Sequence, residues 1–268
     1  MSKLFLIYFI SSGVFSQTYF AGKTPDQIVE LKKKATLKME IINEKNKVIN
    51  TFVGFFIEKN GRFATVYHSF QDDFKFEKNK VQIAVRDGSG NEFKDVIIEG
   101  CSNKNNIDIC TGLIKNHNPK YYFNFSTADR RVGELFSSIG HCKDDQLAPF
   151  THKKGEVSKV TSNYQSAYSA VGDIVNLNTK LFEVNLPKCV GDSGGPLFDQ
   201  FSGALLGMYS FAYKNHYFAI DSSEIKKIFD ENLNKVHYEV PTDRIFVSDP
   251  CLKAKKGTRE YENCLTFQ

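Results

Sequence analysis

One serine of this chain stands in a stretch of unusually small residues, KCVGDSGGPL, at residues 188–197. A serine hydroxyl acts as a nucleophile where it is exposed, lies next to a base and has donors nearby for the oxyanion that forms. Neighbouring backbone N–H groups can point at one position only where the chain adopts unusual φ values and no Cβ obstructs it. Glycine allows both, because it has no Cβ. We therefore predict Ser193 as a nucleophile, with the N–H groups of Gly191 and Ser193 as an oxyanion hole. A glycine-rich turn with an incidental serine is the alternative, but a turn needs fewer such residues.

A nucleophilic serine needs a base, usually histidine, and an acid that orients that histidine. Of the six histidines, only His68 ends an apolar strand-like run with small residues before it, in FATVYHSF at residues 63–70. Asp108, in NNIDICTGLI, stands where a polar turn enters an apolar run, which is a place for a partly buried carboxylate. The order His68, Asp108, Ser193 favours one β-unit for the first two residues and a second unit for the serine.

The elements that must position these residues are mostly short strands. Apolar or alternating runs bounded by turn residues predict strands at residues 36–43, 48–57, 63–67, 80–85, 93–99, 109–114, 133–139, 155–161, 180–186, 196–198, 204–211 and 217–220. About a dozen strands at this spacing fit two β-barrels or a sandwich.

Two helices flank the strands. Thr24 followed by Pro25 is typical of a helix start and predicts a short helix to about residue 34. Near the end of the chain, Ser222 or Ser223 would cap a second helix. The apolar stripe of that helix is Ile225, Ile228, Phe229, Leu233 and Val236.

Residues 1–16 have the pattern of a secretory signal peptide, with a short positive start, an apolar run and a small residue at Ser16 before the expected cut. An uncleaved membrane anchor is disfavoured, because a span needs about 20 apolar residues. We therefore expect a secreted or periplasmic protein without stable membrane insertion. The net charge of +4 is small and its basic residues are dispersed, so no nucleic-acid partner is indicated.

In an oxidising compartment the six cysteines indicate disulfides, although the sequence leaves many pairings open. Two pairs are favoured by spacing, because one flanks a polar turn between strand-like runs and the other brackets a basic tail. The remaining two cysteines are far apart in the sequence. The candidate pairs are Cys101 with Cys110, Cys251 with Cys264, and Cys142 with Cys189.

No cofactor or metal is expected. No CxxC motif occurs, which disfavours a zinc cluster. The acidic pairs Asp72–Asp73 and Asp144–Asp145 could hold a structural Ca²⁺, but we interpret them as solvated loops.

The motif GDSGGP is similar to the nucleophile motif of the chymotrypsin-like (trypsin-like) serine proteases. Residues 53–68, VGFFIEKNGRFATVYH, resemble the histidine segment of that clan. Their pattern most resembles that of the Deg or high-temperature-requirement proteases and the bacterial glutamyl endopeptidases. NIDI at residues 106–109 resembles the aspartate segment, and VGELFSSIG at residues 132–140 resembles the strand that opens the second barrel. The resemblance spans residues 36–236 in order.

The resemblance implies an all-β fold of two six-stranded antiparallel β-barrels, with a short N-terminal helix and a C-terminal helix. The peptidase domain would occupy residues 36–236 without a PDZ domain, and its barrels would meet near residues 120–132. Residues 17–35 would form an N-terminal segment, and residues 237–268 a tail with a further disulfide.

The activity that the resemblance implies is that of a monomeric serine endopeptidase, which hydrolyses protein or peptide substrates through an acyl-enzyme. His68 would act as general base and then acid, Asp108 would orient it, and Ser193 would attack. A catalytically silent homologue that serves as a secreted binding module is the alternative, although no triad residue is missing. A coincidental motif in an esterase or a lectin-like domain is disfavoured by the ordered resemblance.

The resemblance also assigns substrate contacts. An extended peptide would lie along Ser210, Phe211 and Ala212, with Phe211 as an aromatic wall. Pro187 stands where an aspartate would select Lys or Arg, so trypsin-type cleavage is not expected.

Two further residues, Lys188 and His216, match positions that line the primary pocket. Facing inward, they would favour an acidic or polar P1 side chain. The alternative is that Lys188 extends into solvent and that His216 is a wall residue.

One departure from the family concerns Asp192, whose counterpart often pairs with a freed N-terminus. No IVGG-like start occurs here, so Asp192 has no obvious partner. Two explanations are possible: the enzyme is active without zymogen cleavage, or the Asp192 carboxylate forms a local hydrogen bond. We favour the first. In this fold the loop after Gly140 lies near the oxyanion segment, which supports a Cys142–Cys189 bridge.

Overall fold

A computed structural model describes residue 20 and residues 22–42, 45–70, 82–101, 107–142, 150–161, 179–186, 189–213 and 215–233. Several predicted features lie outside these ranges: the signal peptide, Pro187, Lys188, the two acidic pairs, Cys251, Cys264 and the C-terminal tail. No helix within the described ranges is both long enough and apolar enough to span a bilayer.

The first element is α1 (Pro25–Lys33), which begins where the sequence predicts it. The Thr24 hydroxyl accepts a hydrogen bond from the Gln27 N–H, and the Gln27 side chain accepts one from the Thr24 N–H. This reciprocal capping satisfies two donors that the first turn leaves unpaired. The helix buries Ile28 and Val29 and packs against the second half of the chain.

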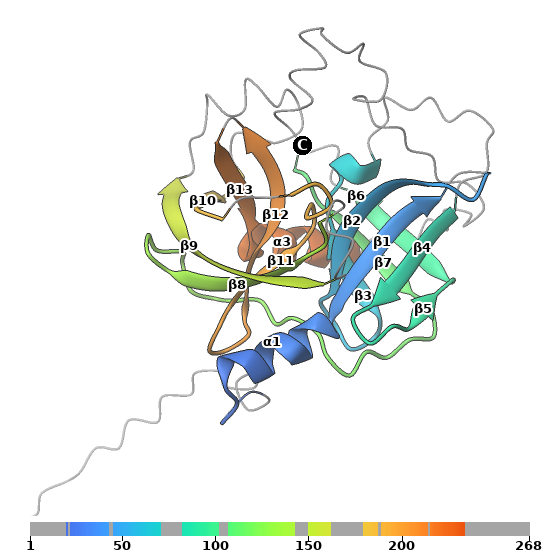
Figure 1. Ribbon diagram of the computed structural model, residues 1–268, viewed down its shortest axis with the longest axis horizontal. Coiled ribbons are helices and arrows are strands. Elements are labelled where there is room, and N and C mark those ends of the chain that lie inside the picture. Colours follow the sequence, from blue (N-terminus) through green and yellow to red (C-terminus); the bar gives the residue numbers. More distant parts are fainter. Residues whose placement is uncertain are drawn as a thin grey trace, which may run out of the picture.

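The first half of the chain forms a seven-stranded antiparallel sheet in the order β5-β4-β1-β2-β3-β7-β6 (Figure 1). Its strands are β1 (Thr36–Ile42), β2 (Val48–Phe56), β3 (Arg62–Thr65), β4 (Gln82–Asp87), β5 (Glu92–Phe93), β6 (Val96–Cys101) and β7 (Cys110–Ile114). The sheet curls around an apolar cluster that includes Leu37, Phe52, Phe56 and Phe63.

This sheet is a half-barrel of seven strands, whereas the family resemblance implies a barrel of six strands. The single strand predicted at residues 93–99 is divided by Lys94 and Asp95 into β5 and β6. The β5 strand pairs with β4 at one edge of the sheet, and β6 pairs with β7 at the other edge. The predicted Cys101–Cys110 disulfide is confirmed and joins opposed residues of β6 and β7.

The second half forms the predicted closed six-stranded antiparallel barrel, in the order β10-β13-β12-β11-β8-β9. Its strands are β8 (Leu135–Gly140), β9 (Thr151–Thr161), β10 (Leu181–Val184), β11 (Pro196–Asp199), β12 (Leu205–Tyr213) and β13 (His216–Asp221). Phe136, Phe182, Leu197 and Tyr209 belong to its core. The two β-units lie side by side (Figure 1).

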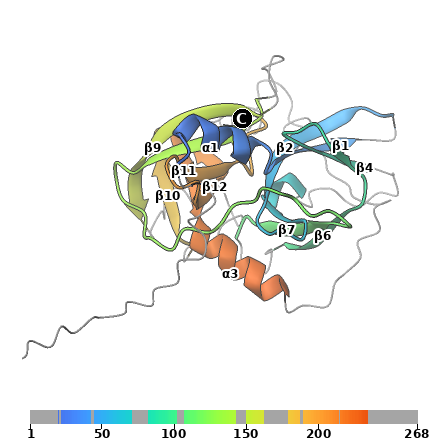
Figure 2. The same cartoon turned by 90° about the horizontal axis from the view of Figure 1, so that it is seen from below.

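The C-terminal helix α3 (Ser222–Leu233) packs against β12, β13 and also β7, so it contacts both β-units (Figure 2). It buries Ile225, Ile228 and Phe229, as the apolar stripe predicts. The cap differs from the prediction, because the Asp221 carboxylate, one residue earlier, accepts the hydrogen bond from the Ser223 N–H at 2.8 Å. Val236 lies outside the described residues.

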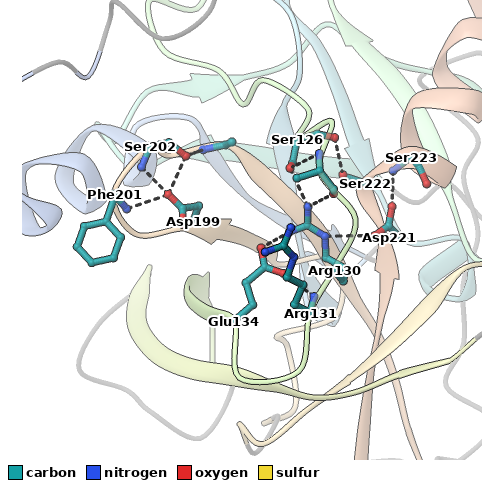
Figure 3. A network of polar contacts seen from close by, with 12 residues as sticks. Ser126, Arg130, Arg131, Glu134, Asp199, Phe201, Ser202, Asp221, Ser222 and Ser223 are labelled. Carbon is teal, nitrogen blue, oxygen red and sulfur yellow. Dashed lines mark hydrogen bonds and ion pairs between the residues drawn. The ribbon is translucent and has the colours of Figure 1, made fainter.

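A buried arginine ties the segment that connects the two sheets to the start of α3 (Figure 3). Arg130 donates to the Ser126 hydroxyl and to the Glu134 carboxylate, both at 2.7 Å. Its Nε lies 3.4 Å from the carboxylate of Asp221, the residue that caps α3. The network therefore holds the connecting segment against the end of β13 and the start of α3.

Candidate active site

His68 and Asp108 meet at one end of the half-barrel. His68 opens a short 3-10 helix, η2 (His68–Phe70), just after β3, and Asp108 lies just before β7, the strand that pairs with β3. The His68 N–H donates to Asp108 Oδ1 at 2.6 Å, and Nδ1 of the ring lies 2.7 Å from Oδ2. The carboxylate therefore contacts both the backbone and the ring of His68, which fixes the orientation of the imidazole.

Ser193 comes from the other β-unit and reaches the opposite nitrogen of the same ring. Its Oγ lies 3.0 Å from His68 Nε2. The three side chains thus form one line of hydrogen bonds from Asp108 through His68 to Ser193. Such a line can pass a proton from a serine hydroxyl to an imidazole.

Asp108 has a third donor that sequence reasoning missed. The side chain is fully buried, and its Oδ2 also accepts a hydrogen bond from the hydroxyl of Ser210 on β12. A buried carboxylate needs such donors because it has left water. The signal in the sequence was a serine inside the apolar run of β12, but we assigned Ser210 to substrate contact instead.

The backbone around Ser193 has the glycine conformations that the motif predicts. Gly191 and Gly194 have φ values of 99° and 83°, in the region that side chains rarely adopt. The N–H groups of Asp192, Gly194 and Gly195 donate to backbone carbonyls. Those of Gly191 and Ser193 have no acceptor in the part of the chain that the structure describes. Two free donors therefore flank Asp192, next to the Ser193 hydroxyl.

The carboxylate of Asp192 has a partner that the sequence did not reveal. Lys153 on β9 places Nζ 2.5 Å from Asp192 Oδ2, and the Cys189 N–H donates to the same oxygen at 2.9 Å. The predicted disulfide between Cys142 and Cys189 is confirmed and lies beside this pair. The local interaction of Asp192, which we had considered less favoured, is therefore present.

Of the described residues that were predicted to bind substrate, the three on β12 are buried and only His216 is exposed. Phe211 and Ala212 are buried, and the Phe211 ring stacks on Phe218 with centroids 4.9 Å apart. His216 is exposed, and its Nδ1 lies 2.5 Å from a Glu183 carboxylate oxygen. An acidic substrate side chain would therefore have to compete with Glu183 for this imidazole.

Tyr209, in the core of the closed barrel, forms a hydrogen bond with the segment that precedes the serine loop. Tyr209 is buried, and its hydroxyl donates to the Leu186 carbonyl at 3.0 Å. Burial, with a smaller contribution from the negative charge of Asp192, raises the pKa of this phenol. Tyr209 therefore stays neutral and acts as a hydrogen-bond donor in this position.

One group of possible metal ligands occurs among the described residues: Cys142, Cys189 and Asp192. Both sulfur atoms belong to the disulfide, so neither is the thiolate that a metal would need. Asp192 is already bound by Lys153. These residues do not fit a metal centre.

Comparison with known proteins identifies the fold. No protein-family model matches the chain, and no curated protein matches it by sequence. A serine endoprotease from Yersinia pestis superposes with a TM-score of 0.60 at 17% identity, over 81% of this chain and 69% of that one. The chain has the chymotrypsin-like fold. The resemblance predicted from the motifs is thereby confirmed at the level of the fold.

Two further structures with this fold match at the same identity. The protease Rv3671c from M. tuberculosis, in an inactive form, has a TM-score of 0.59 at 17% identity over 78% of this chain and 92% of that one. The HtrA-type protease AlgW, solved with a tripeptide, has a TM-score of 0.62 at 17% identity over 79% of this chain and 64% of that one. All three are proteases, and at this identity the likeness extends to the fold alone.

Proposed function

We propose that this protein is a secreted serine endopeptidase that hydrolyses peptide bonds through an acyl-enzyme. The observation that carries the proposal is the position of His68, whose ring lies 2.7 Å from the Asp108 carboxylate and 3.0 Å from the Ser193 hydroxyl. The chymotrypsin-like fold, shared with proteases, supports the same reading.

The first step is attack on the substrate carbonyl. His68 accepts the proton of the Ser193 hydroxyl through Nε2 as Oγ bonds to the carbonyl carbon. The buried Asp108 carboxylate accepts the hydrogen bond of the Nδ1–H, so the ring keeps the tautomer whose Nε2 is free and the imidazolium that forms is stabilised. The negative charge that develops on the carbonyl oxygen is stabilised by the free N–H groups of Gly191 and Ser193.

The remaining steps return the site to its starting state. His68 donates its proton to the leaving amine, and the C–N bond breaks to leave an acyl ester on Ser193. A water molecule then gives a proton to His68 and attacks the ester, and His68 returns that proton to the Ser193 oxygen as the acid leaves. No metal or cofactor takes part in these steps.

Export is supported by the two disulfides and by the signal-peptide pattern of residues 1–16. The N-terminal sequence of protein exported from a secretory host tests it, and we expect Gln17 as the first residue. A chain that stays in the cytoplasm with Met1 retained would contradict this part of the proposal.

A fluorophosphonate probe, which reacts with activated serines, tests the catalytic proposal on the mature protein. We expect covalent labelling at Ser193 and hydrolysis of a peptide library. Both are lost in Ser193→Ala and fall by about 10⁴- to 10⁶-fold in His68→Ala. His117 is the matched control, because it follows β7 at the opposite end of that strand from Asp108, where its ring packs on Phe56.

Folded mature protein that is neither labelled nor active would contradict the endopeptidase proposal. It would favour the alternative of a secreted binding module on a protease fold. Circular dichroism and a cooperative thermal transition establish that the protein used is folded.

A further inference from the structure

The carboxylate of Asp192 is one of the most deeply buried charges among the described residues. The side chain is 1% exposed, and its Oδ1 has no hydrogen-bond partner there. A carboxylate without water must be compensated by an opposite charge, or it moves out to solvent or takes up a proton. The position of this side chain therefore depends on the groups that face its other oxygen.

Those groups contact the carboxylate from several sides. Lys153 Nζ and the Cys189 N–H both contact Asp192 Oδ2. On the far side, Gly140 at the end of β8 has no side chain, and a Cβ there would stand 1.9 Å from Asp192 Oδ1. The ion pair is therefore enclosed by β8, β9 and the disulfide-bonded segment that precedes the nucleophile.

The backbone of Asp192 connects this ion pair to the oxyanion donors. Its carbonyl accepts a hydrogen bond from the Gly195 N–H at 2.9 Å. Because a peptide unit is planar, the direction of that carbonyl also sets the direction of the Ser193 N–H on the same unit. The Asp192 N–H donates to the Cys189 carbonyl at 3.1 Å, which closes the turn around Gly191. A displaced Asp192 would turn both free N–H groups away from a common point.

We propose that Lys153 is a positioning residue that holds the oxyanion hole in its working geometry through Asp192. The cation is internal to the chain, so a new N-terminus released by cleavage is not needed for this purpose. The inference rests on the endopeptidase function proposed above, and it adds a residue from β9 that neither touches substrate nor belongs to the triad.

The test compares variants of the mature protein by steady-state hydrolysis, with the concentration of active sites measured by titration. Lys153→Met keeps most of the length of the side chain but removes its charge. We expect kcat to fall about 10²- to 10³-fold, the range for losing an oxyanion donor, while KM changes little. Lys153→Arg keeps the charge and should restore most of kcat.

The neighbouring Lys154 is the matched control. It is exposed on the same strand, and Lys154→Met should leave kcat and KM unchanged. If Lys153→Met does not fold, Lys153→Gln carries the test, since its amide can still donate to Asp192 but brings no charge. A purely structural role would lower the melting temperature and leave kcat per titrated site unchanged.

The outcomes separate this inference from the function on which it rests. An active wild type with an equally active Lys153→Met overturns the positioning role alone. A wild type that neither reacts with the probe nor hydrolyses peptides overturns the endopeptidase proposal, and this inference with it. A loss of kcat in Lys153→Met that Lys153→Arg restores supports both.

Discussion

The N–H of Val53 on β2 donates to the carbonyl of Ser193 at 2.7 Å, so the half-barrel directly holds the loop that carries the hydroxyl. The contact is possible because the next residue is glycine. A Cβ on Gly194 would stand 1.9 Å from the Val53 carbonyl oxygen, and the φ of Gly194 is 83°. Gly194 therefore allows the close contact between the two β-units as well as the turn itself.

Gly194→Ala is expected to abolish labelling of Ser193 and to destabilise the protein. The left-handed backbone alone costs a non-glycine residue about 1–2 kcal/mol, and the clash with backbone adds to this. Gly90→Ala is the control, since Gly90 has a φ of 86° with open space around the position of a Cβ. Urea denaturation should show a loss in both variants, and probe labelling should fail only in Gly194→Ala. Normal labelling of Gly194→Ala would contradict the role of this close approach.

Ser210→Ala removes one of the donors to the buried Asp108 carboxylate. A hydrogen bond to a charged group contributes about 1.5–3 kcal/mol, so we expect kcat to fall about 10- to 100-fold. The control is Ser137→Ala, because Ser137 is also buried in the second barrel but bonds to His152. Steady-state kinetics should show a loss only for Ser210→Ala. An unchanged kcat, with KM raised instead, would favour our original assignment of Ser210 to substrate contact.

The local parts of the fold could be predicted because their signals lie within a few residues of each other. Thr24 and Pro25 predict the start of α1. The GDSGGP motif predicts the positive φ values of Gly191 and Gly194, since no other residue type would tolerate them as well. The strands of the closed barrel were found from apolar runs and turns, apart from shifted ends such as the longer β9.

The parts that could not be predicted depend on contacts between distant segments. Lys153 is one of 35 lysines and arginines, and no sequence neighbour of Lys153 marks it as the residue that faces Asp192. The predicted strand is divided at Lys94 and Asp95 because its first part pairs with β4 and its second part with β7. The sequence does not show which strands pair with each other. Ser210 likewise meets Asp108 only in the folded chain, because the two residues are 102 positions apart in the sequence.

The two described disulfides should differ in their effect on stability and on catalysis. The Cys101–Cys110 bridge spans 9 positions of the chain and the Cys142–Cys189 bridge spans 47. From loop-closure entropy, the first bridge should stabilise the folded protein by about 3 kcal/mol and the second by about 4 kcal/mol. The double variant Cys142→Ser with Cys189→Ser should therefore lose more stability than Cys101→Ser with Cys110→Ser. Only the loss of the Cys142–Cys189 bridge should also lower kcat, because the Cys189 N–H donates to the Asp192 carboxylate and the Cys189 carbonyl accepts from the Asp192 N–H. Denaturation midpoints and kcat of the two double variants test this, and equal kcat values would contradict it.

Lys32 should make stability depend on pH in the alkaline range. The side chain is fully buried on α1, donates to the Tyr122 carbonyl at 2.8 Å and lies over the rings of Phe20 and Phe123. Burial lowers the pKa of its ammonium from 10.5 to about 7. Between these values the unfolded chain holds a proton that the folded protein lacks, so the free energy of unfolding rises with pH. The shift corresponds to no more than about 5 kcal/mol, and the penalty is fully present below pH 7.

The measurement is the free energy of unfolding of wild type and Lys32→Met from pH 6 to pH 10. The variant has no titrating group at this position, so its advantage should be constant below about pH 7 and shrink steadily as the pH rises further. Other titrating groups contribute equally to both proteins and cancel in the difference. Lys33→Met is the control, because Lys33 is only partly buried on the same helix and pairs with Glu30. A difference between wild type and Lys32→Met that stays flat from pH 7 to pH 10 would show that Lys32 keeps its ordinary pKa in the folded protein.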